Sequence, residues 1–181
     1  MRKKISNLFM TIFLSGCGAT VNNIGSVHDK NISGSSKHML VVNNLSNDNL
    51  SKQGEFISED LKNKLNSCNV LAYTYNTNGL SLNPNTDINN IISDYKIDRV
   101  ISLTNRNITV NQSHVVLSQV IVAKVYDIAL KKNIWMSEYQ YNGSEWHFGG
   151  IWTRHDVKAA QMTTKSIIAG LENDGVIGKC Q

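Results

Sequence analysis

The first sixteen residues restrict the fold most, because their composition excludes them from any folded domain. Three basic residues, Arg2 to Lys4, precede an apolar run of about ten residues that ends at Leu14. A helix of that length cannot cross a hydrocarbon core, which needs roughly 20 residues. A basic flank followed by a short apolar run is typical of a secretory signal. We therefore expect residues 1–16 to be removed, which leaves about 165 of the 181 residues for one domain with its own core.

The signal ends in Leu14-Ser15-Gly16-Cys17, which resembles the lipobox of bacterial lipoproteins: an aliphatic residue, two small residues and a cysteine. The resemblance implies cleavage before Cys17, a diacylglycerol on its thiol and an N-acyl chain on its new amine. More than one acyl chain is needed to hold a protein stably on a membrane. Gly18 stands where lipoproteins kept at the inner membrane carry an aspartate, so the pattern favours an outer-membrane location facing the periplasm, with the outer leaflet as the alternative. The alternatives are a plain secretory signal with an incidental cysteine, or a short helix of the core.

Without the signal, the chain is close to neutral. The signal holds three of the 18 Lys and Arg residues and none of the 14 Asp and Glu residues, which leaves 15 basic against 14 acidic side chains. Nucleic-acid-binding domains carry a clear basic excess. We therefore expect no nucleic-acid partner.

Two cysteines remain beyond Cys17, at positions 68 and 180. Export would bring Cys68 and Cys180 into an oxidising compartment, where an even number of cysteines favours a disulfide. The alternative is a pair of buried free thiols, which pack as small apolar side chains. A redox role would prefer a close Cys-x-x-Cys pair, which the chain lacks.

The remaining chain divides into a tether and one domain. Residues 17–37, the lipid-bearing cysteine and a small, polar segment without periodicity, indicate a flexible tether. Residues 38–181 alternate strand and helix patterns. We expect strands at 39–42, 70–75, 98–110, 115–130 and 134–141, and helices at 54–67, from Asn85 or Thr86 to Tyr95, and at 157–171. The order βαβαβββα predicts an α+β fold, an α/β sandwich in which one mixed five-stranded sheet packs against helices.

Two segments resemble a broad group of envelope lipoproteins. One runs Val-Tyr-Asp-Ile-Ala over 125–129 and continues through Lys131-Lys132 to Ile134-Trp135; the other is Leu171-x-x-Asp174-Gly175-Val176-Ile177. The group shares its fold with the amino-terminal domain of the Tol-system propeller protein. The curli-secretion lipoprotein and the lipoproteins that activate penicillin-binding proteins are relatives in fold. The resemblance implies the fold and no particular partner.

The sequence carries no signature of an enzyme. Gly-x-Ser-x-Gly, Gly-x-Gly-x-x-Gly and the P-loop pattern are all absent. Of five histidines, His147 and His155 are eight residues apart, and with Glu145 or Asp156 they could in principle meet a metal. Ordinary surface histidines explain them better, so we expect no catalytic residue, no metal and no cofactor beyond the acyl chains on Cys17.

The most unusual stretch is Trp146-His147-Phe148-Gly149-Gly150-Ile151-Trp152, in a loop before the last helix. Aromatic side chains are enriched in protein-binding hot spots, so partner binding could involve Trp146, Phe148, Ile151 and Trp152. The alternative is a loop that closes over one end of the core, where the two glycines permit a tight bend.

These features lead to two hypotheses of different classes. The first is a non-catalytic envelope lipoprotein that attaches to the membrane through its lipid and binds another envelope protein as an assembly or regulatory component. The second is a small-molecule- or glycan-binding domain, or an envelope enzyme, that uses the 143–156 loop as a pocket wall. It rests on Glu145, Trp146, His147 and His155 alone.

Overall fold

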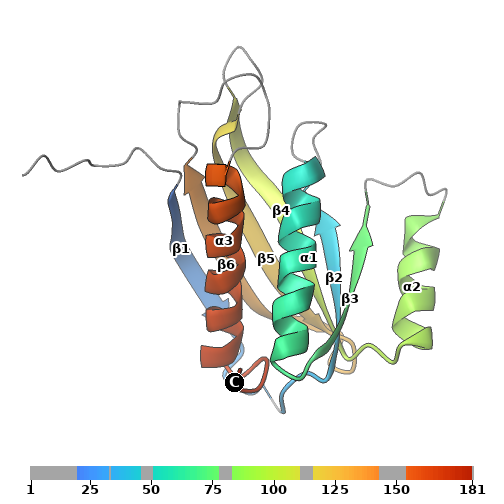
Figure 1. The fold of residues 1–181 in the computed structure, drawn as a ribbon. Coiled ribbons are helices and arrows are strands. Elements are labelled where there is room, and N and C mark those ends of the chain that lie inside the picture. Colours follow the sequence, from blue (N-terminus) through green and yellow to red (C-terminus); the bar gives the residue numbers. More distant parts are fainter. Residues whose placement is uncertain are drawn as a thin grey trace, which may run out of the picture.

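The computed structural model describes residues 20–32, 34–45, 51–77, 83–110, 116–142 and 154–180. These residues form one mixed sheet and three helices (Figure 1). The elements are β1 (Thr20–His28), β2 (His38–Asn44), α1 (Ser51–Ser67), β3 (Leu71–Asn76), α2 (Pro84–Asp94), β4 (Arg99–Val110), β5 (Val116–Asp127), β6 (Lys132–Asn142) and α3 (Arg154–Asn173).

The strands form one open sheet in the order β1-β6-β5-β4-β2-β3. β2 runs parallel to both β3 and β4. The chain passes from β2 to β3 through α1 and from β3 to β4 through α2, and parallel strands need such crossover connections. β4, β5, β6 and β1 pair antiparallel. The α+β class, the mixed sheet and the predicted order of helices and strands over 38–181 are thus confirmed.

The sheet has six strands and not five, because β1 comes from the segment that we expected to be a tether. Residues 20–28 pair antiparallel with β6, from Thr20 opposite Asn142 to His28 opposite Trp135, with one irregularity at Ile24. The expectation of a flexible tether is therefore wrong for these residues. Backbone hydrogen bonds hold the strand, and a polar edge strand with few buried side chains gives little apolar pattern to detect.

Two helices cover one face of the sheet. Figure 1 shows α1 and α3 side by side across it. Ile57, Leu61 and Leu65 recur at helical spacing on α1 and are fully buried, as are Ile167 and Leu171 of α3. We call this side the helix face. Burial of apolar surface between these helices and the sheet is the main stabilising contribution to the fold.

On the opposite side of the sheet, which we call the bare face, a helix of the described chain covers one edge only. Ile88, Ile91 and Ile92 of α2 pack near Leu40 and Val42, whose side chains point away from the helix face. Beyond this second cluster, no described helix packs on the bare faces of β5, β6 and β1. Among the described residues no helix has the length and apolarity needed to cross a bilayer.

Gly170 sets how closely α3 can approach the sheet. A Cβ atom at this position would lie 2.9 Å from Cζ2 of Trp135. The Trp135 ring cannot easily move, because it is buried and its Nε1 donates a hydrogen bond to Asp174 Oδ2 at 2.8 Å. A glycine here therefore permits close helix–sheet packing.

We expect Gly170→Ala to destabilise the protein. Alanine raises helix propensity by about 1 kcal/mol, but overpacking against a fixed ring costs about 1–3 kcal/mol, so the net loss should be about 1 kcal/mol. Urea unfolding followed by circular dichroism measures it. Gly25→Ala is the control, because nothing lies within 4 Å of its Cβ position. Equal stability of both variants would show that α3 moves freely over Trp135.

Candidate functional sites

Most of the predicted site residues lie outside the described residues. These are Cys17, the predicted lipidation position, and the aromatic side chains Trp146, Phe148 and Trp152, together with Ile151. Glu145 and His147 also lie outside the described residues. For His155, the structure describes the backbone, which belongs to α3, but not the side chain. The roles predicted for these residues therefore stay predictions.

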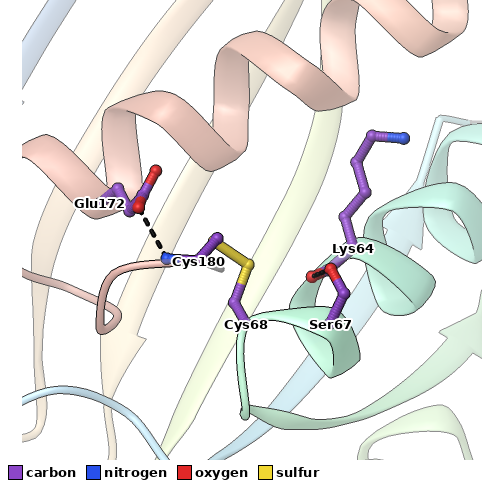
Figure 2. The surroundings of a disulfide bond; sticks show 5 residues. All are labelled: Lys64, Ser67, Cys68, Glu172 and Cys180. Atoms are coloured by element: carbon purple, nitrogen blue, oxygen red, sulfur yellow. Dashed lines mark hydrogen bonds between the residues drawn. A yellow bond between two sulfur atoms is a disulfide. The ribbon is translucent and has the colours of Figure 1, made fainter.

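The structure brings the two remaining cysteines together. Cys68 follows the end of α1, Cys180 lies in the tail after α3, and a disulfide joins them with 4.2 Å between their Cα atoms (Figure 2). The backbone N–H of Cys180 also donates to Glu172 Oε1 at 2.7 Å. The disulfide closes a loop between positions 112 residues apart. Such a cross-link restricts the unfolded chain and fixes the carboxyl-terminal tail against α1.

A cavity of about 380 Å³ opens at the end of the sheet where β4 begins and β5 ends. This is the lower end of the sheet as drawn in Figure 1. Its polar wall comes from Ser36, Asp98, Arg99 and Asp127. Its apolar wall includes Leu130, in the turn between β5 and β6, which is 47% exposed. Sequence analysis did not predict this site.

The buried guanidinium of Arg99 organises the cavity. Its Nε donates to Asp127 Oδ2 at 3.1 Å, which ties β4 to β5. Its Nη1 donates to the carbonyl of Val176 at 2.6 Å, and its Nη2 to the carbonyl of Gly34 at 2.9 Å. A single planar cation therefore connects two strands, the segment before β2 and the tail after α3.

The neighbouring carboxylate of Asp98 fixes the start of β2. Its Oδ2 accepts hydrogen bonds from the backbone N–H groups of Lys37 at 2.7 Å and His38 at 3.1 Å. Its Oδ1 accepts a hydrogen bond from the Ser36 hydroxyl. The carboxylates of Asp98 and Asp127 thus both hold backbone in place, which is a structural use of their charge.

The pKa of Asp127 lies below its usual value. Burial alone would raise the pKa of this carboxyl. The backbone N–H of Leu130 and the guanidinium of Arg99 outweigh burial, because both stabilise the ionised form. Asp127 therefore stays ionised at neutral pH and compensates the buried charge of Arg99.

A second polar cluster joins three elements at the same end of the sheet. Asp174, just after α3, accepts from Trp135 Nε1 of β6 and lies 3.2 Å from His28 Nδ1 of β1. Among the described residues, no serine or cysteine is hydrogen-bonded to His28, as the nucleophile of an acid–histidine catalytic group would be. In the described part of the chain, no group of three His, Cys, Asp or Glu side chains could hold a metal.

The sequence did contain a signal for the Arg99 cluster. Arg99 and Asp127 stand at the ends of two Val- and Ile-rich strands, and buried arginine is rare unless it is paired. The register of the two strands, which places these residues directly opposite each other, could not be read from the sequence.

Comparison with known proteins supports the fold. No protein-family model and no curated protein matches the chain. A solved PelC dodecamer from Paraburkholderia phytofirmans is 10% identical, with a TM-score of 0.50, and the match covers 89% of this chain and 99% of that chain. A single-residue variant of that dodecamer gives the same identity and TM-score, covering 84% and 98% of the two chains. Lipoprotein GNA1162 from Neisseria meningitidis is 17% identical, with a TM-score of 0.39, covering 75% and 98%. At these identities the PelC likeness concerns the fold alone.

We expect Asp127→Asn to destabilise the protein by about 3 kcal/mol at neutral pH, because it leaves the buried Arg99 charge uncompensated. Glu138→Gln is the matched control. It breaks the pair between Glu138 and Arg106, whose side chain is 53% exposed, and should cost less than about 1 kcal/mol. Urea unfolding of both variants measures the difference.

The same comparison in acid tests the cause. A carboxyl whose folded pKa is lowered stabilises the fold above its unfolded pKa, and this contribution disappears as pH falls through the folded value. The gap between wild type and Asp127→Asn should therefore narrow below about pH 4. If the difference in unfolding free energy between wild type and Asp127→Asn stays constant in acid, the loss of stability comes from altered packing and not from the lost charge.

Proposed function

We propose that this protein is a lipid-anchored lipoprotein of the outer membrane that acts without catalysis by binding another envelope protein. The lipobox sequence Leu14-Ser15-Gly16-Cys17 after a basic and apolar signal carries this proposal. The diacylglycerol and the N-acyl chain on Cys17 would provide the membrane attachment. Gly18, in the place of a retention aspartate, supports the outer membrane.

Two structural observations agree with export and cleavage. The described fold begins at Thr20, so cleavage before Cys17 removes no part of any described element. The disulfide between Cys68 and Cys180 suits an oxidising compartment. Neither observation depends on the lipobox, and both are expected of a chain that folds outside the cytoplasm.

Binding without catalysis is the simplest role for the described domain. Its buried charged groups Arg99 and Asp127, and the partly buried Asp98, hold backbone segments together. The second hypothesis, a ligand-binding or enzymatic role of the 143–156 loop, gains no support from the described residues. The PelC structures are dodecamers, so the bound envelope protein could be further copies of this chain. Native mass spectrometry of the purified lipoprotein would reveal such an assembly.

We expect Cys17→Ser to abolish both incorporation of labelled fatty acid and membrane association, because serine offers no thiol for the diacylglyceryl group. Cells fed labelled palmitate and then fractionated provide the measurement. Cys68→Ser is the control, since it removes a different sulfur and should keep the label. A Cys17→Ser chain that still carries the label in the membrane fraction would contradict the proposal.

We expect Trp146→Ala combined with Trp152→Ala to weaken capture of a specific envelope protein by crosslinking in cells, since interface aromatic residues carry much of the binding energy. Thermal unfolding of the purified variant separates the two interpretations of this loop. An unchanged melting temperature with lost capture supports partner binding. A large drop in melting temperature supports closure of the core.

A further inference from the structure

The position of β1 limits how far the domain can lie from the membrane. If Cys17 carries the lipid, three peptide units separate it from Thr20, the first residue of β1. Consecutive Cα atoms are 3.8 Å apart, so the two Cα atoms are at most roughly 11 Å apart. The polar layer of one leaflet is itself about 5–7 Å thick. The start of β1 must therefore lie at the surface of the lipid headgroups.

β1 also carries the most exposed large apolar side chains of the described chain. Val27 is 58% exposed and Ile24 is 52% exposed. β1 is an edge strand, and no described strand pairs with its outer side. Val27 points to the bare face, because its neighbour His28 reaches Asp174 at the helix face. The strand that begins beside the lipid thus displays two exposed apolar side chains, Val27 on the bare face and Ile24 at the register shift between Asn23 and Gly25.

In the middle of the bare face, two apolar side chains of β5 are covered. Val120 and Val122 of β5 are only 5% and 6% exposed, although no described helix packs on them. Arg106 lies opposite Val120, Glu138 lies opposite Val122, and the two charged side chains form an ion pair of 2.5 Å. Long charged side chains can cover apolar neighbours in this way. Tyr126, near the end of β5, is 38% exposed, but the most exposed apolar side chains lie at the β1 edge.

The side chains next to Val27 suit a phospholipid surface. Val27 pairs with Met136 of β6, and Met136 pairs with Lys124 of β5, so the three form one row across the bare face. Met136 and Lys124 are both partly exposed. Apolar side chains beside a basic one are the composition that binds the interface of anionic membranes.

We propose that β1 lies along the bilayer, with Val27 and Ile24 in the headgroup layer and Lys124 facing anionic lipid. Val27 is seven residues beyond Thr20, about 23 Å along a strand. A lipid at one end and apolar side chains toward the other would hold β1 parallel to the membrane and keep the domain from rotating about its anchor. This inference rests on the proposed lipidation of Cys17.

Two labelled lipoproteins test the orientation. Val27→Cys and Leu71→Cys each receive an environment-sensitive NBD fluorophore, while Cys68 and Cys180 stay in their disulfide. Leu71 is the matched site, because it is 50% exposed on β3, at the opposite edge of the sheet. The full lipoproteins are reconstituted into liposomes of phosphatidylethanolamine and phosphatidylglycerol, with and without brominated acyl chains. Near-ultraviolet circular dichroism checks that both variants are folded.

We expect the label at position 27 to shift to the blue and to be quenched by brominated lipid severalfold more than the label at position 71. Equal and weak quenching at both positions would show that the domain stands away from the bilayer and would overturn the inference. A blue shift at position 27 without bromine quenching would place the strand between copies of the chain, which also overturns it. Liposome flotation separates these results from failure of the anchor, because a chain without lipid does not float.

Discussion

The lower end of the fold depends on one buried cation. The carboxylate of Asp127 compensates the charge of Arg99. Nη1 and Nη2 of the guanidinium donate hydrogen bonds to the carbonyl groups of Val176 and Gly34. These partners come from three parts of the chain, and the backbone N–H of Ser36 donates to the same carbonyl of Val176. A buried guanidinium costs free energy until its donors are paired, so the cluster specifies one arrangement of these segments. The disulfide adds a covalent constraint to the same tail, since Cys180 follows Val176 by four residues.

The sequence predicted those parts of the fold that bury apolar side chains with a clear period. Ile57, Leu61 and Leu65 revealed α1, and the Val- and Ile-rich runs revealed β4 and β5. β1 escaped prediction because only one of its nine residues, Val21, is buried. Its stability comes from backbone pairing with β6, which depends on a partner more than a hundred residues away. Local patterns carry no information about such pairing.

The candidate sites also differ in whether local sequence or the three-dimensional arrangement determines them. The pairing of Cys68 with Cys180 could be predicted, because two cysteines in an exported domain allow only one intramolecular bond. The Arg99 cluster could not, because it depends on strand register and on a carbonyl of the tail. Trp135 illustrates an intermediate case. Its burial was predictable from its place in an apolar strand, but its hydrogen bond to Asp174 and the close approach of Gly170 required the three-dimensional arrangement.

The loss of the expected tether changes what a lipid anchor would do for this domain. A flexible linker of about twenty residues would allow an r.m.s. reach of roughly 25 Å and free rotation. A connection of three peptide units to a strand that is paired with β6 allows neither. The membrane would then restrict which surfaces a partner can approach. The helices α1 and α3 and the cavity beside Asp98 lie on elements other than β1, so they would stay accessible to a partner protein if β1 rested on lipid. An exposed β1 edge would otherwise invite pairing with another strand, and contact with the bilayer would limit access to it.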